Sequence, residues 1–280
     1  MDEQRTCVIT GAAGGIGRAT ATQMASRGFR VFAIVRNSDT SRAAVADIGR
    51  AVPDADVRPF FADLSSLHDV RAVAAAIAAS TDRIDVLINN AGVYKRQRQD
   101  SVDGYEMTFA VNYLAPFLLT TELLPRLGTT PDSRIVNVTS ALYRKGSADG
   151  PLPPPTDGFS GKSAYATSKR LLVQFTMALA SRMESDGGTA NCVHPGVVAT
   201  DVFRDYPRLV AKSLNRFLSS PADGAQPVLH LATSSDLAGV TGAYFEEMTR
   251  KDVSPRDRDP ALLDRLWGTS ENLVARSGRD

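Results

Sequence analysis

The sequence predicts an α/β fold in which one parallel sheet is covered by helices on both faces. Short apolar segments alternate with longer Ala- and Leu-rich segments of helical period. The short segments are apolar nearly throughout, which is typical of strands buried on both faces of a parallel sheet. The alternation shows no internal repeat and no break in composition. We therefore expect a single doubly wound domain over residues 1–280.

Seven strands are expected along the chain. In order, they are TCVIT (6–10), RVFAIV (30–35), DVRPFF (56–61), IDVLIN (84–89), RIVNVT (134–139), TANCVH (189–194) and GAYF (242–245). The clearest helical segments are GRATATQMASRG (17–28), LHDVRAVAAAIAAS (67–80), SKRLLVQFTMALASRME (168–184) and DPALLDRLWGTSENLVARS (259–277). We expect Asp259 to cap the last helix, with Pro260 at its first position. Trp267, the only tryptophan, should pack that helix against the core.

Two segments interrupt this alternation. A Pro-rich insert at about 143–162, which contains SADGPLPPPTDGFSG, must be largely loop. The segment at about 201–220, DVFRDYPRLVAKSLNRFLSS, is amphipathic, and we expect it to cover a substrate pocket as a lid.

Bulk properties exclude several classes of partner. The net charge of +1 gives no general attraction to nucleic acid or to an anionic membrane. No apolar run approaches the ~18 residues of a membrane span, and the N-terminus enters a strand at once rather than forming a signal peptide. Cys7 and Cys192 lie in apolar runs, so we expect buried free thiols in a cytoplasmic protein and no zinc site. The histidines His68, His194 and His230 are scattered and are interpreted as structural or surface residues.

A glycine-rich turn, TGAAGGIG, follows the first strand directly. Glycines at this point allow a tight turn and a close approach of the backbone to a pyrophosphate, and the following helix offers free N–H groups. The residues expected to contact the cofactor here are Gly11, Gly14, Gly15, Ile16 and Gly17. The second strand ends in Val35, where an acidic residue would bind the ribose of NAD, and Arg36 follows. Because arginine can clamp a 2′-phosphate, the sequence favours NADP(H) over NAD(H).

Tyr165 and Lys169 stand four residues apart in a helical segment, so their side chains share one face. An ammonium close to a phenol favours the phenolate and lowers the pKa of the phenol, which would suit proton transfer near neutral pH. The same spacing also fits an exposed Tyr and Lys on a solvated helix face. The pair alone leaves both interpretations open.

Over nearly its whole length the chain resembles the short-chain dehydrogenase/reductase family. The matching motifs, in order, are TGAAGGIG (10–17), Asp63–Leu64, NNAG (89–92), Asn112 in AVNYLAP, Ser140 after RIVNVT, YATSK (165–169) and HPGVVAT (194–200). The order of these motifs on successive strand–helix units is highly specific, although each is weak alone.

The resemblance implies a Rossmann-type fold and a role for each matching residue. Tyr165 would be the general acid or base, Lys169 would lower its pKa and hold the nicotinamide ribose, and Ser140 would hydrogen-bond the substrate oxygen. Asn112 would hold a water in a relay to Lys169. The remaining cofactor contacts implied are Asp63, Leu64, Asn90, Ala91, Gly92, Pro195, Gly196, Val198 and Thr200. Simpler structural roles stay open for Asn112 as a satisfied polar residue, for Ser140 as a strand-end hydroxyl and for Asp63 as a helix cap.

The chain departs from the common family pattern in two places. The long interval between Ser140 and Tyr165 is similar to that of the retinol dehydrogenase-like branch, whose members act on lipophilic substrates. Ala115 replaces the glycine that often follows the family's asparagine. Membrane members of that branch begin with an apolar anchor that is not seen here, so a soluble protein is expected.

The function expected from the resemblance is hydride transfer between NADP(H) and a small-molecule carbonyl or secondary alcohol, with a bulky or lipophilic ketone or aldehyde favoured. Expected substrate contacts, besides Ser140 and Tyr165, are Leu142, Tyr143, Phe159, Val202, Phe203 and Tyr206. Two alternatives remain: reduction of a carbon–carbon double bond, and a non-catalytic NADP(H)-binding scaffold. A homo-oligomer is compatible with the sequence, but the sequence does not determine it.

Overall fold

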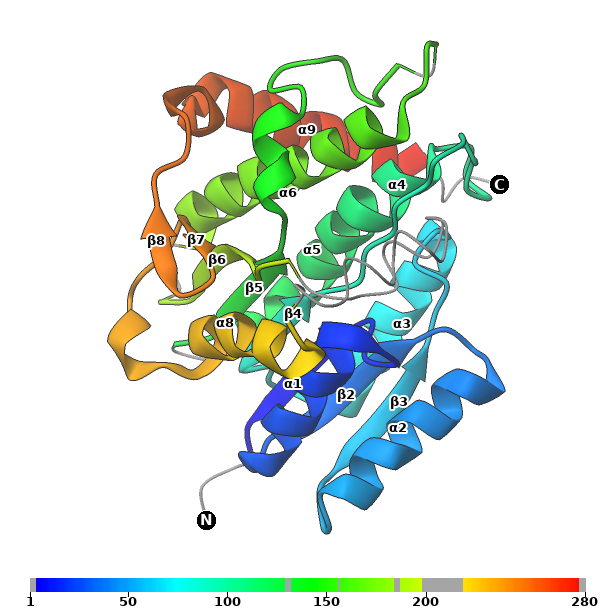
Figure 1. Cartoon of the computed structure of the whole chain (residues 1–280), viewed down its shortest axis with the longest axis vertical. Coiled ribbons are helices and arrows are strands. Elements are labelled where there is room, and N and C mark those ends of the chain that lie inside the picture. The colour runs from blue at the N-terminus through cyan, green and yellow to red at the C-terminus, as the bar shows by residue number, and fades with distance from the viewer. Residues whose placement is uncertain (1–3, 129–131, 156, 184–186, 198–218, 277–280) are drawn as a thin grey trace.

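The computed structural model describes residues 4–128, 132–155, 157–183, 187–197 and 219–276 (Figure 1). It forms one α/β domain built on an eight-stranded sheet. The strands are β1 (Thr6–Thr10), β2 (Arg30–Val35), β3 (Val57–Phe61), β4 (Val86–Asn89), β5 (Arg134–Val138), β6 (Thr189–His194), β7 (Ala243–Glu246) and β8 (Thr249–Lys251).

The strand order is β3-β2-β1-β4-β5-β6-β7-β8, and all pairs are parallel except β7 with β8. The order reverses between β1 and β4, and a ligand site is expected at the carboxyl ends of strands at such a switch point. The glycine-rich turn follows β1 and therefore lies at this point. The expected single-domain, doubly wound fold is confirmed.

Helices cover both faces of the sheet (Figure 1). The longer ones are α1 (Gly15–Ser26), α2 (Asp39–Ala51), α3 (Leu67–Ser80), α5 (Ala115–Leu127), α6 (Gly161–Met183), α8 (Pro221–Thr233) and α9 (Pro260–Arg276). Short turns are α4 (Met107–Phe109), the π-helix η1 (Ala110–Leu114) and the 3-10 helices η2 (Ala141–Lys145), η5 (Ser235–Leu237) and η6 (Pro255–Arg258). Apolar residues of α3, α5 and α6 form the core on one face, and those of α1, α2 and α8 form it on the other.

The expected strands agree with the structure except at the chain's last sheet edge. β8 is a short antiparallel strand of exposed Thr, Arg and Lys residues, so no apolar pattern in the sequence predicts it. Charged residues are also how natural sheets protect an edge from further pairing. At the opposite edge, β3 is mostly exposed and contains Pro59, which an edge strand tolerates.

The last helix is positioned as expected. The Asp259 side chain accepts a hydrogen bond from Ala261 N at 3.0 Å, and Pro260 is the first helical residue. The Trp267 ring lies 5.2 Å from the Phe117 ring and 5.9 Å from the Phe175 ring, centroid to centroid, so it joins α9 to α5 and α6. Cys7 and Cys192 are buried free thiols.

One continuous helical stretch, Met107–Leu127, has the length and apolar composition of a membrane span, with a mean hydropathy of 1.2. This finding corrects the expectation that no apolar run in the chain approaches the length of a membrane span. Because 78% of that window is buried inside the protein, its apolar side chains have a sufficient structural role as the core under the sheet.

Candidate active site

Tyr165 and Lys169 lie one turn apart on α6, and both side chains are buried. Tyr165 is 8% exposed and Lys169 is 3% exposed. The Lys169 Nζ lies 5.8 Å from the centre of the Tyr165 ring and donates a hydrogen bond to the Val138 carbonyl at 2.9 Å. The alternative interpretation, an exposed Tyr and Lys on a solvated helix face, is therefore wrong.

Burial sets the protonation of both groups. It lowers the pKa of Lys169 to about 8, because an ammonium loses hydration in the protein interior. It raises the pKa of Tyr165 to about 12, and a hydrogen bond with the Ser140 side chain opposes that rise. The expectation that Lys169 lowers the pKa of the phenol is not met in this structure. The reason is that desolvation of the phenolate outweighs the other influences on Tyr165.

Ser140 is placed by the end of β5. Its side chain caps η2 by accepting a hydrogen bond from Leu142 N at 3.3 Å, and it also bonds the Tyr165 hydroxyl. Ser140 and Tyr165 are separated in the sequence by the Pro-rich insert. Because their side chains are hydrogen-bonded in the fold, the two hydroxyls converge on one point, where a single substrate oxygen could accept from both.

Asn112 lies inside the π-helix η1, fully buried. Its Oδ1 accepts from Val93 N at 2.7 Å, and its Nδ2 donates to Val93 O at 2.9 Å and to Ser168 Oγ at 3.1 Å. These bonds tie the segment after β4 to α6. The structure thus gives Asn112 a positioning role, and its role in a water relay stays a prediction.

The glycine-rich turn has the backbone that a dinucleotide site requires. Gly11 and Gly15 have φ angles of +72° and +51°, in the left-handed region that favours glycine. A Cβ on Gly17 would collide with the Gly11 carbonyl and with the Asn90 amide. Helix α1 begins after Gly14 with no side-chain cap, so its N-terminal N–H groups are not used by a capping side chain. The turn therefore fits a pyrophosphate.

Arg36 and Asp63 line one pocket of about 560 Å³ at the ends of β2 and β3. Asn37 and Ser38 line the same pocket and were not among the predicted contacts, although they are the polar neighbours of Arg36 in the sequence. Asp63 is not the cap of α3. Its Oδ1 accepts from Ser65 N at 2.9 Å, and the cap is Ser66, which accepts from Asp69 N at 3.2 Å. Leu64 packs against the core.

The NNAG segment is fixed by a residue that the sequence analysis did not single out. Thr10, the last residue of β1, accepts from the N–H groups of Asn90 and Ala91 at 3.0 Å each. The Asn90 amide donates to Thr10 O at 2.9 Å. A Cβ on Gly92 would lie 3.3 Å from Lys169 Nζ. Gly92 thus leaves space directly beside the lysine, and the segment joins the glycine-rich turn to the Tyr–Lys pair.

The turn after β6 is described only in part. Gly196 has a φ of +87°, next to Pro195, and Glu247 of the β7–β8 turn lies beside it. His194 is half-buried, and its Nδ1 has no hydrogen-bond partner among the described residues. Five predicted contacts and most of the expected lid at 201–220 lie outside the described residues: Val198, Thr200, Val202, Phe203 and Tyr206.

The predicted substrate contacts before α6 divide into two groups. Leu142 is 41% exposed and follows Ser140, so it remains at the mouth of the site. Tyr143 is 2% exposed, and its ring lies 4.9 Å from the Tyr244 ring in the core, so the structure places it away from the pocket surface. Phe159 is half-buried in the loop before α6. Tyr94 was missed, although its ring lies 5.8 Å from the Tyr165 ring and it follows the NNAG motif closely.

An open parallel sheet with this turn at its switch point, beside a buried Tyr–Lys pair, defines a Rossmann-type dinucleotide-binding protein. Among the described residues no group of three or more His, Cys, Asp or Glu could hold a metal ion. The chain belongs to the short-chain dehydrogenase/reductase family, because the profile of the family described as short chain dehydrogenase matches residues 5–208. It is therefore an oxidoreductase of the short-chain type.

Similar proteins agree with this assignment. The chain is 36% identical to human retinol dehydrogenase 13, over 96% of this chain and 84% of that protein. It is likewise 36% identical to mouse retinol dehydrogenase 14, over 96% and 86% of the two chains. A crystal structure of an uncharacterized protein from Mycobacterium paratuberculosis matches with a TM-score of 0.77 and 30% identity, covering 97% of this chain and 94% of that one.

Proposed function

We propose that the protein transfers hydride between NADP(H) and a carbonyl or secondary alcohol that has a bulky, lipophilic body. The observation that carries this proposal is the convergence of the Ser140 and Tyr165 hydroxyls beside Lys169. When bound, the cofactor supplies or accepts the hydride.

Each residue of the constellation has a distinct part in the proposed reaction. Tyr165, protonated at neutral pH, donates its proton to the substrate oxygen during reduction and recovers it in the reverse direction. Ser140 donates a hydrogen bond to the same oxygen and stabilises its developing negative charge. Lys169, held by the Val138 carbonyl, keeps a positive charge near the phenol and stabilises the phenolate left after proton donation.

The proposed preference for NADP(H) rests on the pocket at the ends of β2 and β3. Arg36 lines it together with Asn37 and Ser38, a set of donors that suits a 2′-phosphate. Asp63 lies in the same pocket and is expected to face the adenine side. A related structure of 29% identity and TM-score 0.69, described as an NAD(P) dependent gluconate 5-dehydrogenase from Beutenbergia cavernae, contains bound NADP at low occupancy.

The proposed substrate class rests on the mouth of the site and on the relatives. Leu142 follows Ser140, and Val197, which is 59% exposed, lies in the turn after β6. Both are apolar residues at the carboxyl ends of neighbouring strands. The relatives named as retinol dehydrogenases indicate an alcohol or aldehyde with a large apolar body.

Reduction of a carbon–carbon double bond is the alternative reaction on this scaffold. The geometry favours the carbonyl reaction, because two hydroxyls directed to one point match a single oxygen. A non-catalytic scaffold is disfavoured by the burial of an intact Tyr–Lys pair. A buried ammonium destabilises the fold, so a protein without proton transfer would have no functional reason to keep it.

The test is a paired titration of the purified chain with NADPH and NADH, followed by cofactor fluorescence, and then NADPH consumption with all-trans-retinal. We expect a clear preference for NADPH and turnover of the aldehyde. Preferential binding of NADH would remove Arg36 from its proposed role. Binding of neither cofactor would contradict the proposed function.

A further inference from the structure

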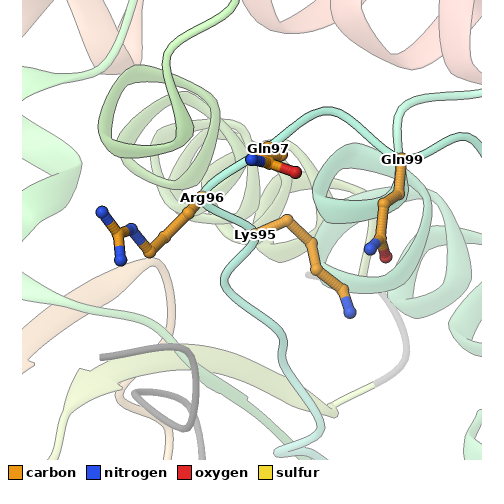
Figure 2. Close-up of a pocket in the computed structure, with 4 residues that line it drawn as sticks. All are labelled: Lys95, Arg96, Gln97 and Gln99. Carbon is orange, nitrogen blue, oxygen red and sulfur yellow. The ribbon is translucent and has the colours of Figure 1, made fainter. Parts of the chain in front are cut away.

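A second pocket lies on the loop that follows the NNAG segment, and its chemistry differs from that of the apolar mouth. Its volume is about 440 Å³, and it is lined by Lys95, Arg96, Gln97 and Gln99 (Figure 2). Two of these side chains are cations, two are amides, and none is acidic. Figure 2 shows Lys95 and Gln99 extending in the same direction from the loop, while Arg96 extends to the other side.

This loop is held at three points, one on η1 and two on α6. Val93 is bonded on both of its backbone groups to Asn112. The Tyr94 ring meets the Tyr165 ring edge to face, with centroids 5.8 Å apart. A Cβ on Gly161, the first residue of α6, would collide with the Lys95 carbonyl. The pocket is therefore a fixed neighbour of the Tyr165 site.

The electrostatic balance of the loop is positive. Within the described part of the chain, no carboxylate forms an ion pair with Lys95, whereas the nearby Arg98 is paired with Asp100 at 2.9 Å. The N-terminus of α6 adjoins the loop and adds the positive end of the helix dipole. Lys95 and the amides that line the pocket with it can donate hydrogen bonds to the oxygens of a carboxylate or phosphate.

We propose that this loop pocket is a specificity subsite for an anionic group on the substrate, so that the substrate is amphipathic: a lipophilic carbonyl or alcohol that carries a carboxylate or phosphate. This inference rests on the proposed function, because it places the reacting oxygen at Tyr165. The apolar residues Leu142 and Val197 contact the body of the substrate, and Lys95 binds its charged end, while Arg96 adds positive charge from the other side of the loop.

The test uses two probes that differ only in charge, 9-oxodecanoate and its methyl ester. Binding to the full-length protein is measured by calorimetry, with and without NADP⁺, which cannot reduce the ketone. We expect the acid to bind about tenfold more tightly than the ester, since exposed ion pairs each contribute modestly. The difference should shrink as ionic strength rises.

Two variants locate the effect. In the double variant Lys95→Gln/Arg96→Gln, the acid should bind no better than the ester, while affinity for NADPH and for the ester should change less than about twofold. Arg98→Gln removes a cation from the same loop but not from the pocket, and it should keep the preference for the acid. A phosphate-bearing ketone, tested in the same way, identifies which anion is preferred.

Several outcomes would overturn the inference: equal affinity for acid and ester, no measurable binding of the acid, or a preference for the acid that survives in the double variant. Failure of the proposed function has a different signature. In that case neither probe would consume NADPH, although the acid would still bind in a manner that depends on Lys95.

Discussion

The Lys169 ammonium lies 5.8 Å from the centre of the Tyr165 ring and is bonded to the Val138 carbonyl. The charge is buried with a main-chain acceptor rather than with a carboxylate. Among the described residues no acidic side chain forms an ion pair with this ammonium, so it can respond to a charge that develops on Tyr165. This relationship predicts an unusual pH dependence of stability.

The pKa of Lys169 is about 8 in the folded protein and 10.5 in the unfolded chain. The contribution of Lys169 to the free energy of unfolding should therefore increase as the pH rises between these two values. The pKa is lower in the folded state, so in that range the unfolded chain binds more protons and stability rises with pH. The measurement is the free energy of unfolding without added cofactor, for wild type and Lys169→Met. From neutral pH to about pH 10, wild type should gain about 2–3 kcal/mol relative to the variant.

Comparing the two proteins removes the opposite contributions of Cys7 and Cys192, whose raised pKa values destabilise the fold at alkaline pH. A difference between wild type and variant that does not change with pH would mean that folding does not lower the pKa of Lys169.

The close approach at Gly17 predicts that Gly17→Ala impairs both folding and cofactor binding. The new methyl group would collide with the Gly11 carbonyl, which cannot move without distorting the turn. We expect a loss of about 1–3 kcal/mol in stability, together with a large loss of NADPH affinity. The control is Gly49→Ala in α2, where a Cβ meets nothing within 4 Å. That substitution should leave binding unchanged and leave stability equal or slightly higher.

The buried pair of Arg170 and Asp257 predicts a large effect far from the reacting atoms. Arg170 donates to Asp257 at 2.8 and 3.1 Å and to the Gly146 carbonyl at 3.0 Å, so it joins α6, η6 and the Pro-rich insert. Asp257→Ala leaves the buried guanidinium unpaired and should cost about 3–5 kcal/mol. The readout is chemical denaturation.

Asp264→Ala is the matched control, because Asp264 is 73% exposed in its pair with Arg182. Asp264→Ala should lower the free energy of unfolding by no more than about 1 kcal/mol. Similar losses in the two variants would show that the Asp257 pair does not anchor the insert.

Arg36 should determine the preference between the two nicotinamide cofactors. Arg36→Asp replaces a cation by an acid in the pocket at the ends of β2 and β3, which should repel a 2′-phosphate and favour ribose hydroxyls. We expect the ratio of kcat/KM for NADPH over NADH to fall about 100-fold, a difference of about 2.7 kcal/mol. An unchanged ratio would assign the preference to other residues.

The sequence was sufficient for the sheet because strands buried on both faces carry an apolar pattern that does not depend on their neighbours. It was not sufficient for β8, whose exposed polar residues pair only because the tight turn at Glu247 brings them back to β7. The cap of α3 could not be assigned from the sequence either. Asp63 and Ser66 both suit a cap, and only the chain's path shows that Ser66 takes that place.

For the site, the motifs predicted which residues take part but not what surrounds them. Spacing predicted that Lys169 lowers the pKa of Tyr165, and burial, which spacing does not report, reverses the direction. The pattern after Ser140 suggested Tyr143 as a substrate contact, whereas the turn of η2 directs it into the core. Tyr94 could not be recognised, because its contact with Tyr165 depends on how the loop is held by Asn112.

The central claim is that Tyr165 is the proton donor of an NADP(H)-dependent enzyme. The most direct measurement compares wild type with Tyr165→Phe, recording NADPH affinity by fluorescence and NADPH consumption with a carbonyl substrate. Tyr94→Phe, which keeps the neighbouring ring, serves as the control and should retain most of the turnover. We expect Tyr165→Phe to bind NADPH within about twofold of wild type and to lose turnover by at least about 100-fold, the range of general acid catalysis. Full turnover in Tyr165→Phe would contradict it.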